Sequence, residues 1–173
     1  GAGPKAQGKR LRPMLLLLSA IAAGEDWQQF LGLASAVELV HNFSLIHDDI
    51  EDNSPLRHGR ETVWKRWGIP QALNAGDLMF TIAHQAVLGT STVLGESTAL
   101  EASRLLHQTC IHLTQGQYLD MSFEQRNDVT AGDYLAMIRG KTSALFGCSI
   151  ELGVIRSNMP IRIAMKSYGV NLG

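Results

Sequence analysis

Residues 41–52 (HNFSLIHDDIED) largely decide how the rest of the chain is interpreted, because an apolar segment with helical spacing ends there in four carboxylates. Negative charge at a helix C-terminus adds to the negative end of the helix dipole, so folding alone gives no reason to place acids there. One interpretation is a solvated acidic helix end. The other is that a cation faces these side chains, which are Asp48, Asp49, Glu51 and Asp52.

The spacing of these acids suits a divalent cation. Asp48 and Asp52 are four residues apart and share one helix face, with Asp49 beside them. Mg²⁺ usually takes one or two protein carboxylates and completes its octahedron with waters and substrate phosphates. The sequence therefore predicts a Mg²⁺ site for a phosphorylated ligand, to which Asp120 could add a carboxylate.

Composition excludes several classes of protein. The chain has 173 residues, of which 45% are hydrophobic, and this is enough for one domain with a hydrophobic core. Its net charge is -1. A near-neutral chain has no general field for nucleic acid or an anionic membrane. Cys110 and Cys148 are far apart and lack metal-ligand spacing, so we expect no disulfide and a reducing, cytoplasmic location.

Apolar residues recur at helical spacing almost everywhere, and no segment alternates with period two, so the fold should be all-α. The stretch after Lys9 and Arg10 imitates a secretion signal, but it is too short to span a bilayer, and Pro13 fits a first helical turn. We therefore expect no membrane span. The predicted helices cover residues 13–23, 27–50, 70–89, 96–124, 130–155 and 160–172, with one long polar, basic loop at 53–69.

Two basic clusters could bind phosphate. The hexapeptide GKRLRP at residues 8–13 puts three cations ahead of a helix N-terminus, where free N–H groups already favour an anion, although a basic surface cap explains it equally well. The second cluster follows the carboxylates in the loop, so that acid, metal, phosphate and base could alternate in space. Its members are Arg57, His58, Arg60, Lys65 and Arg66.

Further polar side chains interrupt the apolar faces of three predicted helices. His41 shares a face with Asp48 two turns away, although a lone histidine there is more often a core residue. Gln117 and Asp120 are three residues apart on a later helix. Lys141 and Thr142 lie on the inward side of the next, where a buried ion pair would explain Asp120 and Lys141 as well as a ligand site does.

The chemistry indicated is electrophilic. The sequence has no nucleophile elbow, P-loop or dinucleotide fingerprint. A metal cluster that pulls on a diphosphate can make it a leaving group, and the carbon left behind is a cation if it is allylic. A closed apolar cavity of helices would protect such a cation from water.

Five motifs in order resemble the trans-isoprenyl diphosphate synthases, the polyprenyl synthetase family. They are GKRLRP (8–13), HNFSLIHDDIED (41–52), RHGR (57–60), GQYLD (116–120) and GKT (140–142). The resemblance implies an isoprenoid synthase-type helical bundle around a central cavity, a homodimer and Mg²⁺. It also implies condensation of isopentenyl diphosphate with an allylic diphosphate, which is dimethylallyl, geranyl or farnesyl diphosphate.

The resemblance also suggests roles for single residues. Asp48, Asp49 and Asp52 match metal ligands, and Gln117 and Asp120 match a helix that faces the reacting carbons and the metal. Lys9, Arg12 and His41 match positions that hold isopentenyl diphosphate. Arg57, Lys141 and Thr142 match positions around the allylic diphosphate.

Two departures from the family pattern matter. His58 stands where the family usually has a second arginine, which removes a permanent charge from the isopentenyl diphosphate site. Residues 152–173 contain no Asp or Glu, and YGVNLG (168–173) resembles the approach to the family's second aspartate-rich motif. We therefore expect the chain to be one domain lacking its C-terminal part, and inactive by itself. A natural truncation without complete catalysis is the other interpretation.

Two residues before Asp48 could limit the length of the product. Ser44 and Phe43 lie four and five residues before Asp48, about 6 and 7.5 Å deeper along the helix axis. Ser44 is only about 40° from Asp48 on a helical wheel, whereas Phe43 is about 140° away. A single Phe with a small neighbour is similar to synthases that make the twenty-carbon geranylgeranyl chain.

Two other functions remain open beside that of a prenyltransferase. One is a non-catalytic diphosphate-binding or subunit-partner protein, and the other is a class I terpene cyclase.

Overall fold

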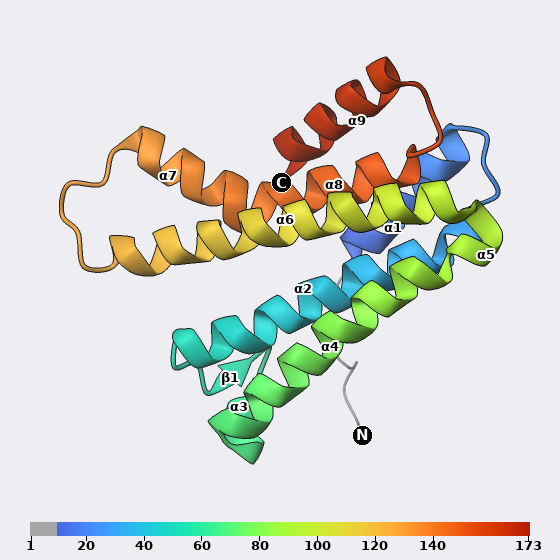
Figure 1. The fold of residues 1–173 in the computed structure, drawn as a ribbon. Helices are drawn as coiled ribbons and strands as arrows, with labels where there is room; N and C mark the ends of the chain where they lie inside the picture. The colour runs from blue at the N-terminus through green and yellow to red at the C-terminus, as the bar shows by residue number, and fades with distance from the viewer. Residues whose placement is uncertain (1–9) are drawn as a thin grey trace.

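Residues 10–173 are described by a computed structural model, and nearly all of their regular structure is helical (Figure 1). The all-α prediction is confirmed. The helical elements are α1 (Leu11–Ala22), η1 (Trp27–Phe30), α2 (Leu31–Glu51), α3 (Val63–Trp67), α4 (Ile69–Gly89), α5 (Ser91–Leu94), α6 (Glu96–Phe123), α7 (Ala131–Ile138), η2 (Arg139–Ser143), α8 (Ala144–Gly153) and α9 (Met159–Leu172).

Three long helices form the centre of the molecule. In Figure 1, α2 and α6 run in the same direction and α4 runs the opposite way along α2. The chain then returns along α6 through α7, η2 and α8, while α9 crosses α8 on the outer side. Fully buried side chains from α1, α2, α6 and α8 meet between these layers, among them Leu16, Leu33, Val37, Leu106 and Leu152.

Local signals in the sequence explain where several helices begin. The Asn158 side chain accepts a hydrogen bond from the Ile161 N–H at 3.1 Å, which caps α9. Thr130 and Asp133 form a reciprocal capping box at the start of α7. Glycine precedes α4 and α6 at positions 68 and 95, where φ is 86° and 89°, a region that L side chains rarely adopt.

Three predicted segments differ from the structure. The helix predicted at 27–50 begins with the 3₁₀ turn η1, because the Asp26 carboxylate caps that turn through the Gln28 N–H. The helix predicted at 130–155 contains the π-helical turn η2. The loop predicted at 53–69 contains the short helix α3 and a hairpin, in which β1 (Leu56–Arg57) pairs with β2 (Arg60–Glu61).

One helical stretch, Trp27–Glu51, is long and apolar enough to cross a membrane, although the sequence predicts no membrane span. Length and apolar composition are also properties of core helices in large helical domains. Here α2 packs against α1, α4 and α8, and Leu33, Val37 and Val40 on it are fully buried in the core. We therefore interpret it as a core helix.

Candidate functional site

Two of the four carboxylates at the end of α2, Asp48 and Asp49, face a cation. The Arg57 Nε donates to Asp49 Oδ1 at 2.8 Å, and its Nη2 donates to Asp48 Oδ2 at 3.0 Å. Asp49 is only 5% exposed, so this charge-assisted pair lies away from most of the solvent. The solvated acidic helix end is therefore wrong for these two residues.

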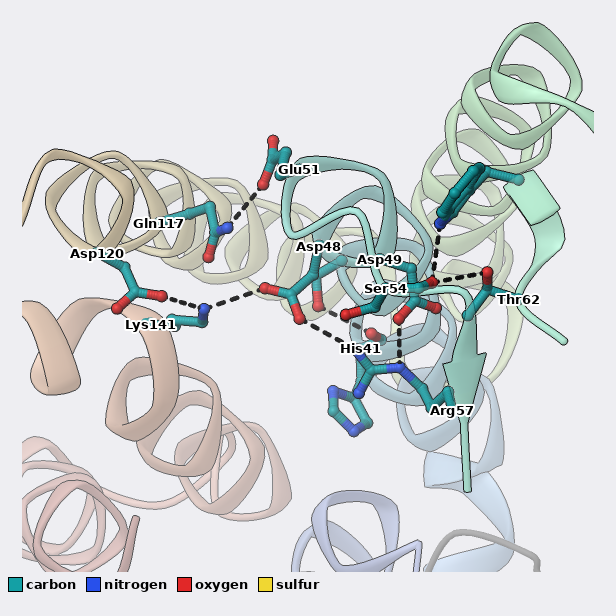
Figure 2. Close-up of polar contacts among 12 residues, drawn as sticks. His41, Asp48, Asp49, Glu51, Ser54, Arg57, Thr62, Gln117, Asp120 and Lys141 are labelled. Atoms are coloured by element: carbon teal, nitrogen blue, oxygen red, sulfur yellow. Dashed lines mark hydrogen bonds and ion pairs between the residues drawn. The ribbon is translucent and has the colours of Figure 1, made fainter. Parts of the chain in front are cut away.

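A second cation joins α2 to α6. The Lys141 Nζ lies 3.0 Å from Asp48 Oδ1 and also donates to Asp120 Oδ2, so one amine connects carboxylates from two helices (Figure 2). Burial by itself lowers the pKa of Lys141, but the hydrogen bonds and negative charges of the Asp120 and Asp48 carboxylates together outweigh it and leave that pKa raised. The ion pair between Lys141 and Asp120 that the sequence left open is present.

The hairpin that carries Arg57 is fixed to the end of α2. The Ser54 carbonyl oxygen accepts hydrogen bonds from Thr62 Oγ1 and from Trp64 Nε1, both at 2.9 Å (Figure 2 labels Ser54 and Thr62). At the tip, His58 and Gly59 have positive φ values of 52° and 76°, as a two-residue type I′ turn requires. His58 is exposed and does not line the cavity described below.

A cavity of about 450 Å³ opens beside the carboxylates, between α2, α6 and η2. Its wall is charged near Asp48 and apolar further in, where Leu45, Leu113 and Leu145 lie. Gln117 Nε2 closes one side by donating to Glu51 Oε2 at 2.7 Å. The other lining residues are Arg12, His41, Phe43, Ser44, His47, Thr114, Tyr118, Met121, Lys141 and Thr142.

Arg12 and His41 form a half-buried pair on the α1 side of the cavity. Arg12 Nη1 lies 3.2 Å from His41 Nε2, and its guanidinium stacks on the Phe146 ring at 4.4 Å. Burial, with the charges of Arg12 and Arg57, lowers the pKa of His41 to about 4. His41 is therefore neutral at pH 7, and its Nε2 can accept the hydrogen bond that Arg12 donates.

The predicted chain-length residues both reach the cavity. Phe43 and Ser44 line it together with Asp48, so the wheel argument that puts the Phe43 ring off to one side is only partly right. The Phe43 ring packs edge-on against Phe80 of α4, with centroids 5.1 Å apart. Phe80 packs in turn against His84, at 4.4 Å. This aromatic row holds the Phe43 ring against the cavity.

Among residues 10–173, no three His, Cys, Asp or Glu side chains are grouped as a ready-made metal site. The donors nevertheless fit Mg²⁺, because Asp48 and Asp120 present carboxylate oxygens to one place, which the Lys141 amine, 3.0 Å from Asp48 Oδ1, occupies in this structure. Asp52 is exposed at the end of α2 and does not line the cavity. Partial burial and the charges of Asp48, Asp120 and Glu124 raise the pKa of Asp52, whereas Lys141 lowers it. A cation there would relieve the repulsion.

The structure brings together most of the predicted site residues. Asp49, Arg57 and Asp120 support the cavity through ion pairs, while Lys9 lies outside the described residues. Two contributors were missed or given no role. Glu51 is bonded to Gln117, and its position within the acidic cluster was a usable signal. Phe146 under Arg12 has no signal in the sequence, because its role depends on how α1 packs against α8.

Solved structures share this fold. A geranylgeranyl pyrophosphate synthetase from Geoglobus acetivorans superposes with a TM-score of 0.92 at 39% identity, over 96% of this chain and 54% of that one. A polyprenyl synthase from Caulobacter crescentus, solved with calcium and isoprenyl diphosphate, gives 0.89 at 32% identity, over 97% of this chain and 50% of that one. The chain therefore has an isoprenoid synthase fold.

The sequence comparisons identify the family. The model of the polyprenyl synthetase family matches residues 3–173, so the chain belongs to that family. A geranylgeranyl diphosphate synthase of Saccharolobus solfataricus is 42% identical, over 97% of this chain and 51% of its own length. A (2E,6E)-farnesyl diphosphate synthase of Mycobacterium bovis is 41% identical, over 96% and 46%. The chain thus spans about half the length of these curated relatives.

Proposed function

We propose that the protein acts in a Mg²⁺-dependent prenyltransferase reaction, in which isopentenyl diphosphate is condensed with an allylic diphosphate to give a longer trans-prenyl diphosphate. One observation carries this proposal. Carboxylates and cations meet at the mouth of a cavity that becomes apolar further in. Such a site suits a ligand with a doubly charged head and a hydrocarbon tail.

The carboxylates of Asp48, Asp52 and Asp120 would hold Mg²⁺, with Asp49 keeping Arg57 in place. When bound, the metal supplies charge neutralisation that makes the diphosphate a better leaving group. Lys141, Thr142 and Arg57 would hold the allylic diphosphate, because an amine, a hydroxyl and a guanidinium are all donors to phosphate oxygens. The apolar wall would keep water from the allylic carbon after the bond breaks.

The second substrate would bind at the Arg12 and His41 side. Arg12 is a permanent cation, and burial lowers its pKa although Glu38 raises it in part. Stacking on Phe146 and the bond to neutral His41 fix its guanidinium for a diphosphate. Gln117 faces the same cavity and would lie near the reacting carbons. We propose Lys9 as a further contact and His58 as a weaker one.

We propose a twenty-carbon geranylgeranyl product. Ser44 leaves room directly beneath the carboxylates, and the Phe43 ring, supported by Phe80, would stop a chain that grows further. The similarity to a geranylgeranyl diphosphate synthase agrees with this length, whereas the similarity to a farnesyl diphosphate synthase is nearly as high. We also propose a homodimer in the cytoplasm, on the resemblance to the family alone.

An assay with Mg²⁺, isopentenyl diphosphate and each allylic primer tests the proposal. It should be run on the 173-residue chain and on any longer product of the same gene. Elongated product supports the prenyltransferase. Binding of both diphosphates without turnover would instead support a non-catalytic or subunit-partner protein, and a cyclic hydrocarbon from the allylic substrate alone would support a terpene cyclase.

A further inference from the structure

The helix that carries Lys141 approaches α6 unusually closely at one point. A Cβ atom added to Gly116 would lie 2.6 Å from the Gly140 carbonyl carbon and 2.8 Å from the Lys141 Cα. A Cβ added to Gly140 would lie 2.8 Å from the His112 carbonyl oxygen and 2.9 Å from the Gly116 Cα. All these neighbours are backbone atoms of the facing helix, so no side-chain rotation could make room.

The same point coincides with the π-helical turn η2, which interrupts an otherwise α-helical path from α7 to α8. A π turn is rare in proteins and interrupts the α-helical hydrogen-bond pattern. Where such turns occur, they are often at functional sites. Here the turn begins one residue before Gly140 and includes Lys141 and Thr142, which both line the cavity. The wide turn and the two glycines thus lie where the amine enters the site.

The geometry on α6 ties this contact to the carboxylates. Gln117 directly follows Gly116, and Asp120 comes one helical turn later on the same helix. The Lys141 backbone packs against Gly116, and from there the Lys141 side chain extends so that its amine pairs with Asp120 and with Asp48. A methyl group added at Gly116 would push the two helices apart and would therefore move the amine relative to both acids.

We propose that Gly116 and Gly140 are positioning residues, whose backbone contact sets how far the Lys141 amine reaches toward Asp48 and Asp120. Neither glycine has a side chain that could touch a ligand, so each acts only through Lys141. The inference deepens the proposed function, and its ligand test rests on that function. A second test, on the amine itself, does not.

The test compares three glycine-to-alanine variants of the full chain. Gly116→Ala alters the proposed contact. Gly32→Ala is the strained control, because its Cβ would lie 2.6 Å from Thr90 Cγ2. Gly32 lies at the beginning of α2, far from Asp48. Gly89→Ala is the unstrained control, since nothing lies within 4 Å of the added atom. Thermal denaturation ranks the three variants by lost stability.

The amine is observed by NMR of protein labelled at the lysine side chains, of which the chain has five. Lys141→Met assigns the Lys141 signal. We expect Gly116→Ala to move this signal toward that of a solvent-exposed lysine, and Gly32→Ala to leave it in place even if it lowers the melting temperature as much. An unmoved Lys141 signal in Gly116→Ala would overturn the proposal.

Calorimetry with inorganic diphosphate and Mg²⁺ gives the second readout. We expect Gly116→Ala to weaken binding by about tenfold, the lower end of what losing a supporting contact costs at metal sites, and both control variants to bind as wild type does. If Gly116→Ala and Gly32→Ala weakened binding equally, the contact would have only a structural role. If wild type did not bind diphosphate, the proposed function would fail, while the NMR result would still decide the positioning role.

Discussion

The Lys141 amine lies 3.0 Å from the Asp48 carboxylate, so it occupies the side of Asp48 that a divalent cation would need. Replacing Lys141 by Met should therefore have opposite effects on two ligands. Mg²⁺ alone should bind roughly tenfold more tightly, which corresponds to about 1.4 kcal/mol, because two carboxylates lose their competing partner. Diphosphate with Mg²⁺ should bind more weakly, because a phosphate donor is lost.

Calorimetric titration of each ligand separately measures both effects. Lys166→Met is the matched control, because Lys166 on α9 pairs with Glu151 on α8 and does not line the cavity. Weaker binding of both ligands in Lys141→Met would mean that the lysine does not compete with the metal.

Removing Asp48 tests whether metal and phosphate depend on one another. Asp48→Ala should reduce Mg²⁺-dependent diphosphate binding by more than about tenfold, because a metal ligand is lost. The fold should survive, because Arg57 keeps Asp49 and Lys141 keeps Asp120. Circular dichroism checks the fold, and Asp77→Ala, at an exposed acid on α4, controls for the change in charge. Equal diphosphate affinity in both variants would leave Asp48 without a role in binding.

Product length should respond to the two residues beneath Asp48 in opposite directions. Phe43→Ala opens the wall that Phe80 supports, so products longer than twenty carbons are expected. Ser44→Phe fills the cavity and should shorten the product toward fifteen carbons. Chromatography of the dephosphorylated products measures this in whichever form of the protein turns over. Ser35→Phe, exposed on the same helix, is the control, and an unchanged distribution in both site variants would place the floor elsewhere.

The low pKa of His41 predicts a dependence of stability on pH. Its ordinary value is 6.5 and its value in the fold is about 4, so between these the unfolded chain binds more protons. The contribution of His41 to the free energy of unfolding is therefore fully present above pH 6.5 and is lost as the pH falls toward 4. Protonation would also leave Nε2 unable to accept from Arg12.

Urea denaturation at pH 7 and pH 5 measures this loss in wild type and in His41→Gln. Other groups titrate in the same range, so the quantity compared is the difference between the two proteins at each pH. We expect wild type to lose more stability than the variant between pH 7 and pH 5. Parallel losses would mean that His41 is accessible to protons in the folded state.

The sequence was informative where the contacts are local and silent where they depend on tertiary approach. The acids at the end of α2 predict a cation, and helical spacing puts Lys141 and Thr142 on the inward side, as the cavity has them. The pairing of Arg57 with Asp48 and Asp49 could not be predicted, because it depends on the conformation of the hairpin.

Two structural features escaped prediction for definite physical reasons. Strands of two residues are too short to show an alternating pattern, although the dipeptide at 58–59 is compatible with a turn. The π turn at 139–143 lies where the chain passes close to Gly116, more than twenty residues away in sequence. Local pattern carries no information about such an approach.

The Ser54 carbonyl oxygen accepts two hydrogen bonds and so joins the segments on either side of the hairpin, whereas the turn at residues 58–59 lies beyond these bonds. Arg57 is held by its ion pairs with Asp48 and Asp49, whereas His58 is constrained by the left-handed backbone conformation of the turn. Substitutions at position 58 are therefore limited by the positive φ of the turn, which favours Asn, Asp or Gly, rather than by contacts with the carboxylates. The hairpin thus joins two neighbouring positions under different constraints, which are charge pairing at Arg57 and backbone conformation at His58.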